Sequence, residues 1–232
     1  EKAGTYVYEV TERDTSHGGV TYDTHAATVT VTVTEDGATG TLSASVSYDN
    51  SLATTEGDRG ETGAAAFTNT YSADNTAFSL DGTKNVDVAD GFTYTLNNGS
   101  FYFDITPLDG APAAATPVGN TGSTQAGGSN DWTSNITLMD NLTFRLSDLE
   151  GAASRDFTYI ITEQSASRPG VGYDTSAYRV VITVTDNGEG KLSVTNTAID
   201  KGTWDAASST FTPAEGGSAA DTVVFTNTYA PG

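Results

Sequence analysis

Apolar and polar residues alternate with a period of two along several stretches of the chain, which is typical of β-strands that bury one face. The clearest stretch is Thr28–Thr34, where valine alternates with threonine. A turn signal at Glu35–Gly37 follows, and a second alternating stretch returns over Thr41–Tyr48. This arrangement predicts a β-hairpin. The same signals predict a second hairpin from Tyr178–Thr185, Asp186–Gly188 and Lys191–Thr195.

Clusters of β-branched and aromatic residues predict further strands. Residues 5–12 are expected to form a strand with one face in the core. The other predicted strands are 67–71, 77–80 continuing into 83–86, 99–106, 136–146 and 157–163. Because no stretch keeps a helical period for more than a turn or two, the chain is predicted to be all-β. Short strands separated by turn signals are typical of an immunoglobulin-like sandwich with Greek-key connections.

The word Phe-Thr-Asn-Thr-Tyr occurs twice, at Phe67–Tyr71 and Phe225–Tyr229. Three earlier segments also match at one constant spacing: 6–12 with 157–163, 22–24 with 173–175, and 29–34 with 180–185. The two copies of Phe-Thr-Asn-Thr-Tyr are slightly further apart than the copies of these three segments, as expected if a loop gained residues. We therefore interpret residues 1–72 as the C-terminal part of one β-sandwich module and residues 73–232 as a complete second module in tandem.

The segment from Pro107 to Asp131 has no hydrophobic period and is rich in Ala, Gly, Pro, Thr and Ser. This composition predicts a long loop, and a loop of that length in a compact module is expected to be functional or mobile.

The amino-acid composition limits the classes of molecule that the chain is expected to bind. The formal charge is −20, with 10 Lys and Arg residues against 30 Asp and Glu residues. So acidic a surface disfavours nucleic acid and anionic membranes as partners. No apolar run is long enough to span a bilayer, and no signal peptide opens the chain. Since the chain begins inside a repeat, however, we interpret it as part of a longer protein.

The sequence indicates neither a cofactor nor an enzyme. His17 and His25 are isolated, and the turn at Asp186–Glu189 lacks the ligand spacing of a calcium loop, so no metal site is predicted. We find no catalytic triad and no phosphate loop. The chain also has no cysteine, so an extracellular protein of this kind would need a crosslink other than a disulfide.

The repeated words, taken together and in order, resemble the streptococcal pilin isopeptide-linkage domain family. The words are Tyr159–Glu163, Tyr173–Thr175, Val180–Leu192 and Phe225–Tyr229. Members of this family build pilus shafts and adhesin stalks on Gram-positive bacteria. The resemblance implies a secreted, extracellular protein at the cell wall, whose partners are neighbouring repeats of the same protein or other pilin subunits.

The resemblance also implies a self-formed amide bond between a lysine of the first strand and the asparagine of the Phe-Thr-Asn-Thr-Tyr word, assisted by a glutamate. In the second module these residues correspond to Lys84, Asn227 and Glu163. In the first module Glu12 and Asn69 match. The opening strand that would carry the lysine is absent there, and Lys2 lies in the wrong place, so Asn69 is expected to lack a covalent partner.

The chemistry requires a buried lysine, because an amine with a pKa near 10.4 is almost entirely protonated in water at neutral pH. Burial lowers the pKa of an amine and raises that of a carboxyl group. We expect Glu163 to be a buried acid that donates to the carbonyl oxygen of Asn227 and then moves a proton to the departing ammonia. Such a reaction occurs once per molecule and is not enzymatic turnover. The expected apolar pocket consists of Phe101, Phe103, Tyr159, Phe225 and Tyr229.

The three residues of the second module also have ordinary structural interpretations that involve no reaction. Asn227 can be a satisfied strand residue, Glu163 a surface carboxylate and Lys84 a solvated lysine. Two functions follow from the sequence. The first is a stalk or pilus-shaft repeat stabilised mechanically by the Lys–Asn bond. The alternative is an adhesin module that binds a host protein, glycan or other surface through residues 107–131, with Trp132 beside them.

Overall fold

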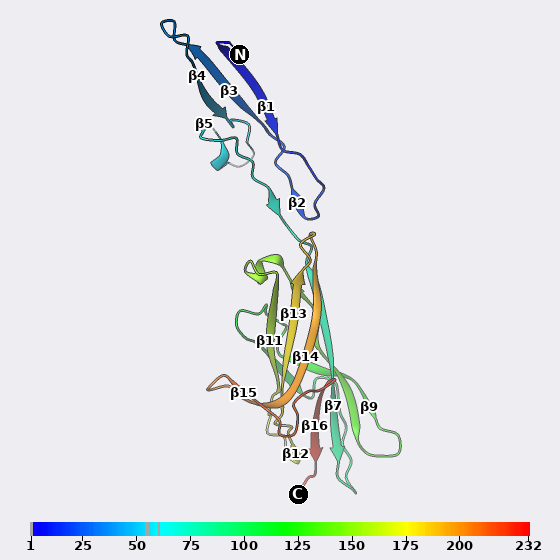
Figure 1. Ribbon diagram of the computed structural model, residues 1–232. Helices are drawn as coiled ribbons and strands as arrows, with labels where there is room; N and C mark the ends of the chain where they lie inside the picture. The colour runs from blue at the N-terminus through cyan, green and yellow to red at the C-terminus, as the bar shows by residue number, and fades with distance from the viewer. Residues whose placement is uncertain (1, 54–55, 60) are drawn as a thin grey trace. The chain divides into compact units, whose positions relative to one another are not determined.

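The computed structural model describes residues 2–53, 56–59 and 61–232. The chain divides into unit 1, Glu1–Ala73 with Gly188–Gly190, and unit 2, Asp74–Asn187 with Lys191–Gly232 (Figure 1). Apart from two short 3₁₀ helices, the elements among the described residues are β-strands, so the all-β prediction is confirmed. None of the described residues belongs to a helix of the length and hydropathy needed to cross a membrane.

Unit 2 is built from the strands of residues 74–232, all of which the structure describes. They are β7 (Thr76–Val88), β8 (Tyr102–Pro107), β9 (Val118–Gln125), β10 (Trp132–Phe144), β11 (Ser154–Glu163), β12 (Val171–Gly172), β13 (Ala177–Asp186), β14 (Leu192–Asp205), β15 (Thr210–Pro213) and β16 (Val223–Tyr229), with a 3₁₀ helix, η2 (Leu146–Leu149), after β10. The hydrogen-bonded order is β12-β16-β7-β10-β9-β8-β11-β13-β14-β15. Strand β9 pairs with both β10 and β8, and so joins two layers.

Aromatic rings pack between these two layers. Phe144 on β10 lies 4.8 Å from Phe157 on β11, centroid to centroid. Phe225 on β16 lies 5.0 Å from Phe103 on β8 and 5.2 Å from Tyr178 on β13. Side chains from β12, β16, β7 and β10 therefore meet those from β8, β11, β13, β14 and β15 in one sandwich core.

The first and last strands of unit 2 are parallel neighbours. β7 and β16 lie side by side and run in parallel (Figure 1). In this pair Lys84 is opposite Phe225 and Val86 is opposite Asn227. Strand residues alternate between the two faces of a sheet, so Lys84 and Val86 share the buried face of β7, and Phe225 and Asn227 share that of β16. This pairing brings the first and last strands of unit 2 into direct contact.

The two predicted hairpins are present. β13 pairs antiparallel with β14 in unit 2, and β3 (Ala26–Glu35) pairs antiparallel with β4 (Leu42–Asp49) in unit 1. The prediction of a structureless loop over residues 107–131 is wrong for Val118–Gln125, which form β9. Small and polar side chains give this strand no apolar period. It is held by backbone pairing and by the buried side chain of Asn120, which accepts a hydrogen bond from the backbone N–H of Phe101 at 2.9 Å.

Unit 1 has fewer layers in its described part. Its elements are β1 (Gly4–Thr11), β2 (Val20–Thr21), β3, β4, a 3₁₀ helix η1 (Glu56–Asp58), β5 (Glu61–Thr62) and β6 (Thr70–Tyr71). The described strands form a sheet in the order β1-β3-β4-β5 and a separate β2-β6 pair.

The prediction that residues 5–12 bury one face in a core is wrong. Every residue of β1 is exposed, because among the described residues no second layer covers its apolar side chains. The predicted strand at Phe67–Tyr71 is also wrong in part, since only Thr70 and Tyr71 are in a strand. Its counterpart β16 is a complete strand because β7 lies beside it.

We predict that Phe157→Ala lowers the free energy of unfolding of unit 2 by about 3–5 kcal/mol, because it leaves a cavity where the ring packs on Phe144. Phe157 is 1% exposed, whereas Tyr102 in the same unit is 44% exposed. The control variant Tyr102→Ala is therefore expected to cost less than about 1 kcal/mol. Denaturant unfolding followed by the fluorescence of Trp132 and Trp204, both in unit 2, measures the two changes. Equal losses would contradict this description of the core.

Candidate functional site

Three polar side chains from three strands meet in the core of unit 2. Lys84 lies on β7, Asn227 on the neighbouring β16 and Glu163 at the end of β11 in the opposite layer. Alternation along each strand points all three inward, as it does for Phe157, Tyr159 and Ile161 on β11. Lys84 and Asn227 are 0% exposed.

Glu163 contacts both partners with its two carboxyl oxygens. Its Oε2 lies 2.9 Å from Nζ of Lys84. Its Oε1 accepts a hydrogen bond of 2.7 Å from Nδ2 of Asn227. The carboxyl group thus touches the amine and the amide nitrogen at the same time.

The surroundings of this pair are apolar. Nζ of Lys84 lies 4.9 Å from the ring centroid of Phe101, and the side chains of Lys84 and Glu163 are both 0% exposed. Burial lowers the pKa of Lys84, and the charge and hydrogen bond of Glu163 oppose this shift. Burial likewise raises the pKa of Glu163, against the opposing effect of Lys84. Both shifts are in the direction of the neutral amine and the neutral acid.

The carbonyl oxygen of Asn227 is held by Asp174, a residue to which the sequence analysis gave no role. The backbone N–H of Asp174 donates to Oδ1 of Asn227 at 2.7 Å. Its side chain accepts hydrogen bonds from the backbone N–H groups of Thr226 at 2.9 Å and Ser176 at 2.8 Å. Burial raises the pKa of Asp174, but these hydrogen bonds outweigh burial and hold the pKa below its ordinary value.

This arrangement corrects one expected contact. Glu163 was expected to donate to the carbonyl oxygen of Asn227, whereas in the structure it faces the amide nitrogen and the Asp174 N–H occupies the oxygen. The signal that could have revealed Asp174 is its place in the repeated word Tyr-Asp-Thr.

The predicted aromatic pocket is present in part. Phe101, Phe103, Tyr159 and Phe225 are buried. The ring of Tyr229 is half-buried and packs against Tyr94, with centroids 4.8 Å apart.

Unit 1 contains the same polar constellation without a lysine. Nδ2 of Asn69 donates to Oε1 of Glu12 at 2.7 Å, and Oδ1 of Asn69 accepts from the backbone N–H of Asp23 at 2.8 Å. The carboxylate of Asp23 accepts from the backbone N–H of Thr68 at 3.2 Å. Lys2, the lysine of this unit, is exposed. The structure thus brings Glu12 and Asn69 together.

His25 takes the place in unit 1 that Ser176 has in unit 2. Its Nδ1 lies 2.7 Å from Oδ1 of Asp23, and its ring stacks on Phe67 with centroids 4.7 Å apart. Sequence reasoning treated His25 as isolated, because its partner Asp23 was not assigned a role. The hydrogen bond from His25 is the main reason that the pKa of Asp23 is lowered from 3.8 to about 2.

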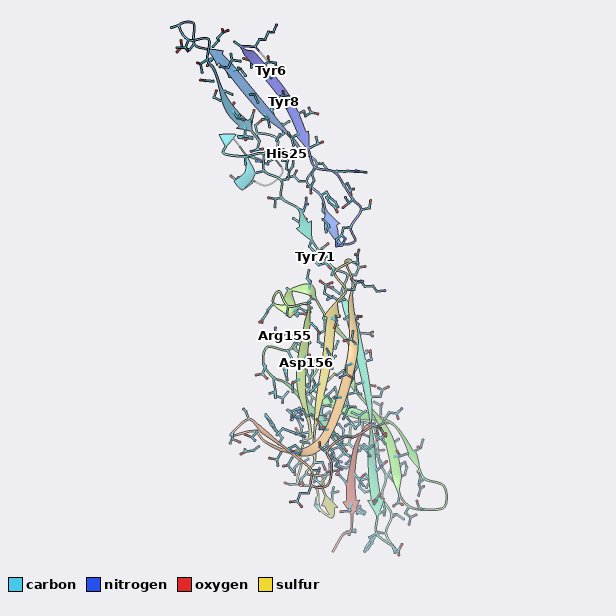
Figure 2. The ribbon with its side chains drawn as sticks, viewed as in Figure 1. Tyr6, Tyr8, His25, Tyr71, Arg155 and Asp156 are labelled. Atoms are coloured by element: carbon cyan, nitrogen blue, oxygen red, sulfur yellow. The ribbon has the colours of Figure 1, made fainter. Side chains whose placement is uncertain are left out.

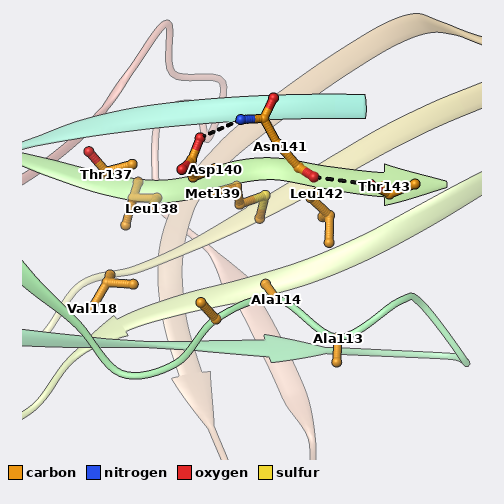
Figure 3. A pocket seen from close by; sticks show the side chains of 11 residues that line it. Ala113, Ala114, Val118, Thr137, Leu138, Met139, Asp140, Asn141, Leu142 and Thr143 are labelled. Carbon is orange, nitrogen blue, oxygen red and sulfur yellow. Dashed lines mark hydrogen bonds between the residues drawn. The ribbon is translucent and has the colours of Figure 1, made fainter. Parts of the chain in front are cut away.

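The described residues contain no cluster of three or more His, Cys, Asp or Glu residues suited to a metal ion. A hollow of about 320 Å³ in unit 2 is lined by Ala113–Ala115, Val118 and Thr137–Thr143. Figure 3 shows the side chains that line it. Its one titratable residue, Asp140, accepts a hydrogen bond of 2.8 Å from Nδ2 of Asn141. The hollow therefore offers apolar surface and no group of convergent ionisable side chains.

Comparison with known protein families gives one match, over residues 1–72 and 80–230, to the model "FctA: Spy0128-like isopeptide containing domain". The chain belongs to this family. It is a structural family of isopeptide-containing domains and not a family of enzymes. The resemblance noted in the repeated words is thereby confirmed. No curated protein matches the chain.

Among solved structures, this isopeptide-domain chain is similar to major pilins of Streptococcus pyogenes. An asparagine-to-alanine point mutant of the major pilin shares 24% identity over 66% of this chain and 51% of its own, with a TM-score of 0.40. The T3.2 major pilin shares 17% identity over 98% of this chain and 68% of its own, with a TM-score of 0.25. The chain spans about half the length of the first of these pilins. The family assignment rests on the family model alone.

We predict that Asp23 titrates near pH 2 and that His25→Ala returns its pKa toward 3.8, because the hydrogen bond from His25 is the largest cause of the shift. The folded-state pKa lies below the unfolded value. The stability that the Asp23 carboxylate contributes is therefore complete above about pH 4 and is lost as the pH falls toward 2. Carboxyl chemical shifts followed by NMR measure both values. A pKa near 3.8 in the parent chain would show that the contact with His25 does not hold.

Proposed function

We propose that the chain is a stalk or pilus-shaft repeat of a Gram-positive cell-surface protein, in which unit 2 is locked by an amide bond between Lys84 and Asn227. The observation that carries the proposal is the simultaneous contact of Glu163 with Nζ of Lys84 and Nδ2 of Asn227 inside an apolar core. Membership of the isopeptide-containing family supports the same conclusion.

The reaction follows from the positions of the atoms. In the buried site a proton passes from the Lys84 ammonium to the Glu163 carboxylate across 2.9 Å, which leaves a neutral amine. The Lys84 nitrogen then attacks the side-chain carbonyl carbon of Asn227. Negative charge develops on Oδ1, where the backbone N–H of Asp174 already donates at 2.7 Å.

Glu163 also serves the departure of the leaving group. Its Oε1 lies 2.7 Å from Nδ2 of Asn227, so the protonated carboxyl group is placed to give its one proton to that nitrogen. The carboxylate that remains then takes a proton from the attacking amine, whose nitrogen lies 2.9 Å from Oε2. The bond from carbon to Nδ2 breaks, and ammonia leaves. One amine and one primary amide thus give one secondary amide and one ammonia, and no cofactor takes part.

The mechanical consequence comes from the topology. Tension enters unit 2 through β7 and leaves it through β16, and these strands are parallel neighbours with Lys84 opposite Phe225. An amide between the two strands carries the load across the unit without separating them. Closing a loop of this length also removes about 5 kcal/mol of unfolded-chain entropy, in the way a disulfide does. This crosslink supplies the covalent support that a chain without cysteine lacks.

We place the protein outside the cell, at the wall of a Gram-positive bacterium, with neighbouring repeats or other pilin subunits as its partners. The family assignment and the covalent chemistry of the core support this location. The adhesive alternative receives less support from the segment 107–131. Part of that segment is the sheet strand β9, and the indole N–H of Trp132 donates to the carbonyl of Tyr94 at 2.8 Å, as an anchoring residue does.

Stretching single molecules by their two ends tests the stalk function. We predict that the parent chain never releases the residues between Lys84 and Asn227, which would add roughly 500 Å of extended chain. The Lys84→Ala and Asn227→Ala variants are expected to release this length when unit 2 unfolds, because nothing covalent bridges β7 and β16. Lys191→Ala, which changes an exposed lysine of unit 2, is the matched control and is expected to behave as the parent.

Release of the full length by the parent chain would contradict the proposed mechanical role. Binding of a host glycan or protein that depends on residues 107–131, with unchanged extension in all variants, would favour the adhesive alternative.

A further inference from the structure

The side-chain amide of Asn227 has two possible orientations, which differ in the atom that faces Glu163. In the structure Nδ2 faces Oε1 of Glu163 at 2.7 Å, and Oδ1 accepts a hydrogen bond of 2.7 Å from the backbone N–H of Asp174. A rotation of the amide by half a turn would exchange its oxygen and its nitrogen. Only the observed orientation lets Glu163 give a proton to the nitrogen that leaves in the proposed reaction.

Glu163 by itself does not select this orientation. As a carboxylate it only accepts hydrogen bonds, and it holds Nδ2 of Asn227. Once it has taken the proton of Lys84, however, it is a carboxylic acid, which can accept from Nδ2 or donate to Oδ1. The N–H of Asp174 has no such choice, because a donor turned toward Nδ2 would meet a second donor. The Asp174 N–H is therefore the contact that distinguishes the two orientations.

Both carboxylate oxygens of Asp174 anchor this N–H. Oδ1 accepts from the backbone N–H of Ser176 at 2.8 Å, a contact two residues along the chain that closes a local turn. Oδ2 accepts from the backbone N–H of Thr226 at 2.9 Å. On this side of β16, β12 pairs with only the last two residues of the strand. The carboxylate thus takes the place of a strand beside Thr226, the residue directly before Asn227.

The same arrangement recurs in unit 1. The backbone N–H of Asp23 donates to Oδ1 of Asn69 at 2.8 Å. The carboxylate of Asp23 accepts from the backbone N–H groups of Thr68 at 3.2 Å and His25 at 3.1 Å. His25 lies directly before β3 (Figure 2) and has the place of Ser176 in the repeat. The aspartate thus makes the same three backbone contacts in both units, although the residue two positions later differs.

The charge of Asp174 does not explain its place beside the site. Burial is the main cause of the lowered pKa of Lys84 and of the raised pKa of Glu163. The negative charge of Asp174 makes a smaller contribution, which raises both pKa values. This contribution favours the ammonium form of Lys84 and the neutral form of Glu163. The two effects oppose each other in the transfer of a proton from Lys84 to Glu163.

We propose that Asp174 is a positioning residue of the amide-forming site: its carboxylate fixes its own N–H against Oδ1 of Asn227 and so directs Nδ2 to Glu163 as the leaving group. This inference rests on the function proposed for unit 2. The nitrogen of Lys84 bonds to the side-chain carbonyl carbon of Asn227, and the bond from that carbon to Nδ2 breaks. Nδ2 leaves as ammonia with the proton of Glu163, whose carboxylate then takes one proton from the attacking nitrogen.

The rate of amide formation in newly synthesised full chain tests this role. Cell-free synthesis followed by intact mass over time measures the loss of one ammonia. We expect Asp174→Asn to slow this loss by about tenfold or more, as a weakened oxyanion contact does. The asparagine would turn an NH₂ group, which is a donor, toward one of the two backbone N–H groups that the carboxylate binds.

Asp87→Asn is the matched control. Asp87 is an exposed residue of β7, and its charge also acts on Lys84. The substitution removes the same charge as Asp174→Asn and leaves the contacts of Asn227 in place. We expect this variant to react no more slowly than the parent, because loss of a nearby negative charge favours the neutral amine.

A chain that is unable to react separates positioning from folding. Lys84→Met keeps the apolar stem of the side chain and removes the amine. In this chain, labelled with ¹⁵N and ¹³C, we expect NMR to show a scalar coupling across the hydrogen bond from the backbone N–H of Asp174 to the side-chain carbonyl of Asn227. Asp174→Asn added to it is expected to remove the coupling, while hydrogen exchange of β11 and β13 stays unchanged.

Three results would overturn the positioning role alone. They are an Asp174→Asn variant that reacts as fast as a reacting parent, an Asp87→Asn variant that is slowed as much as Asp174→Asn, and a Lys84→Met chain without the coupling. A parent chain that loses no ammonia would overturn the function proposed for unit 2, and this inference with it.

Discussion

Burial of the Lys84 ammonium group is the constraint on which the rest of unit 2 depends. A lone charge in an apolar core costs several kcal/mol, and removing one member of a buried pair typically costs about 3–5 kcal/mol. Glu163, in the opposite layer, forms an ion pair with this group, with 2.9 Å between Oε2 of Glu163 and Nζ of Lys84. The pair is nevertheless a poor resting state, since burial lowers the pKa of Lys84 and raises that of Glu163. The proposed conversion of the amine into a neutral amide would remove both charges from the core.

The two units show which parts of the site the fold prepares in advance. In each unit a glutamate holds the asparagine nitrogen and a backbone N–H holds the asparagine oxygen. These contacts come from the back half of the repeat alone. The front half brings the lysine and the covering layer together, because Lys84 lies on β7, between the last strand and β10. Closure of the core and placement of Lys84 beside Asn227 therefore depend on the same strand.

The sequence predicted the all-β fold and both hairpins, because valine and threonine alternate clearly in Thr28–Thr34 and Val180–Thr185. It also selected Lys84, Glu163 and Asn227, which the structure brings together, although their roles stay predictions. It missed β9, whose small polar residues give no period and whose stability comes from backbone pairing on both sides. It missed Asp174 as well, because the contact with Asn227 is made by a backbone N–H, and only the repeat of Tyr-Asp-Thr marked this residue. The exposure of β1 was not predictable from its own apolar pattern, since burial there depends on strands elsewhere in the repeat.

The intact mass of the purified chain, with peptide mapping of the Lys84 and Asn227 segments, tests the central claim most directly. The account predicts a mass one ammonia below that of the sequence, a linked peptide containing both residues, and the full calculated mass for the Glu163→Ala variant. A parent chain at its full calculated mass, with Lys84 and Asn227 in separate peptides, would contradict it.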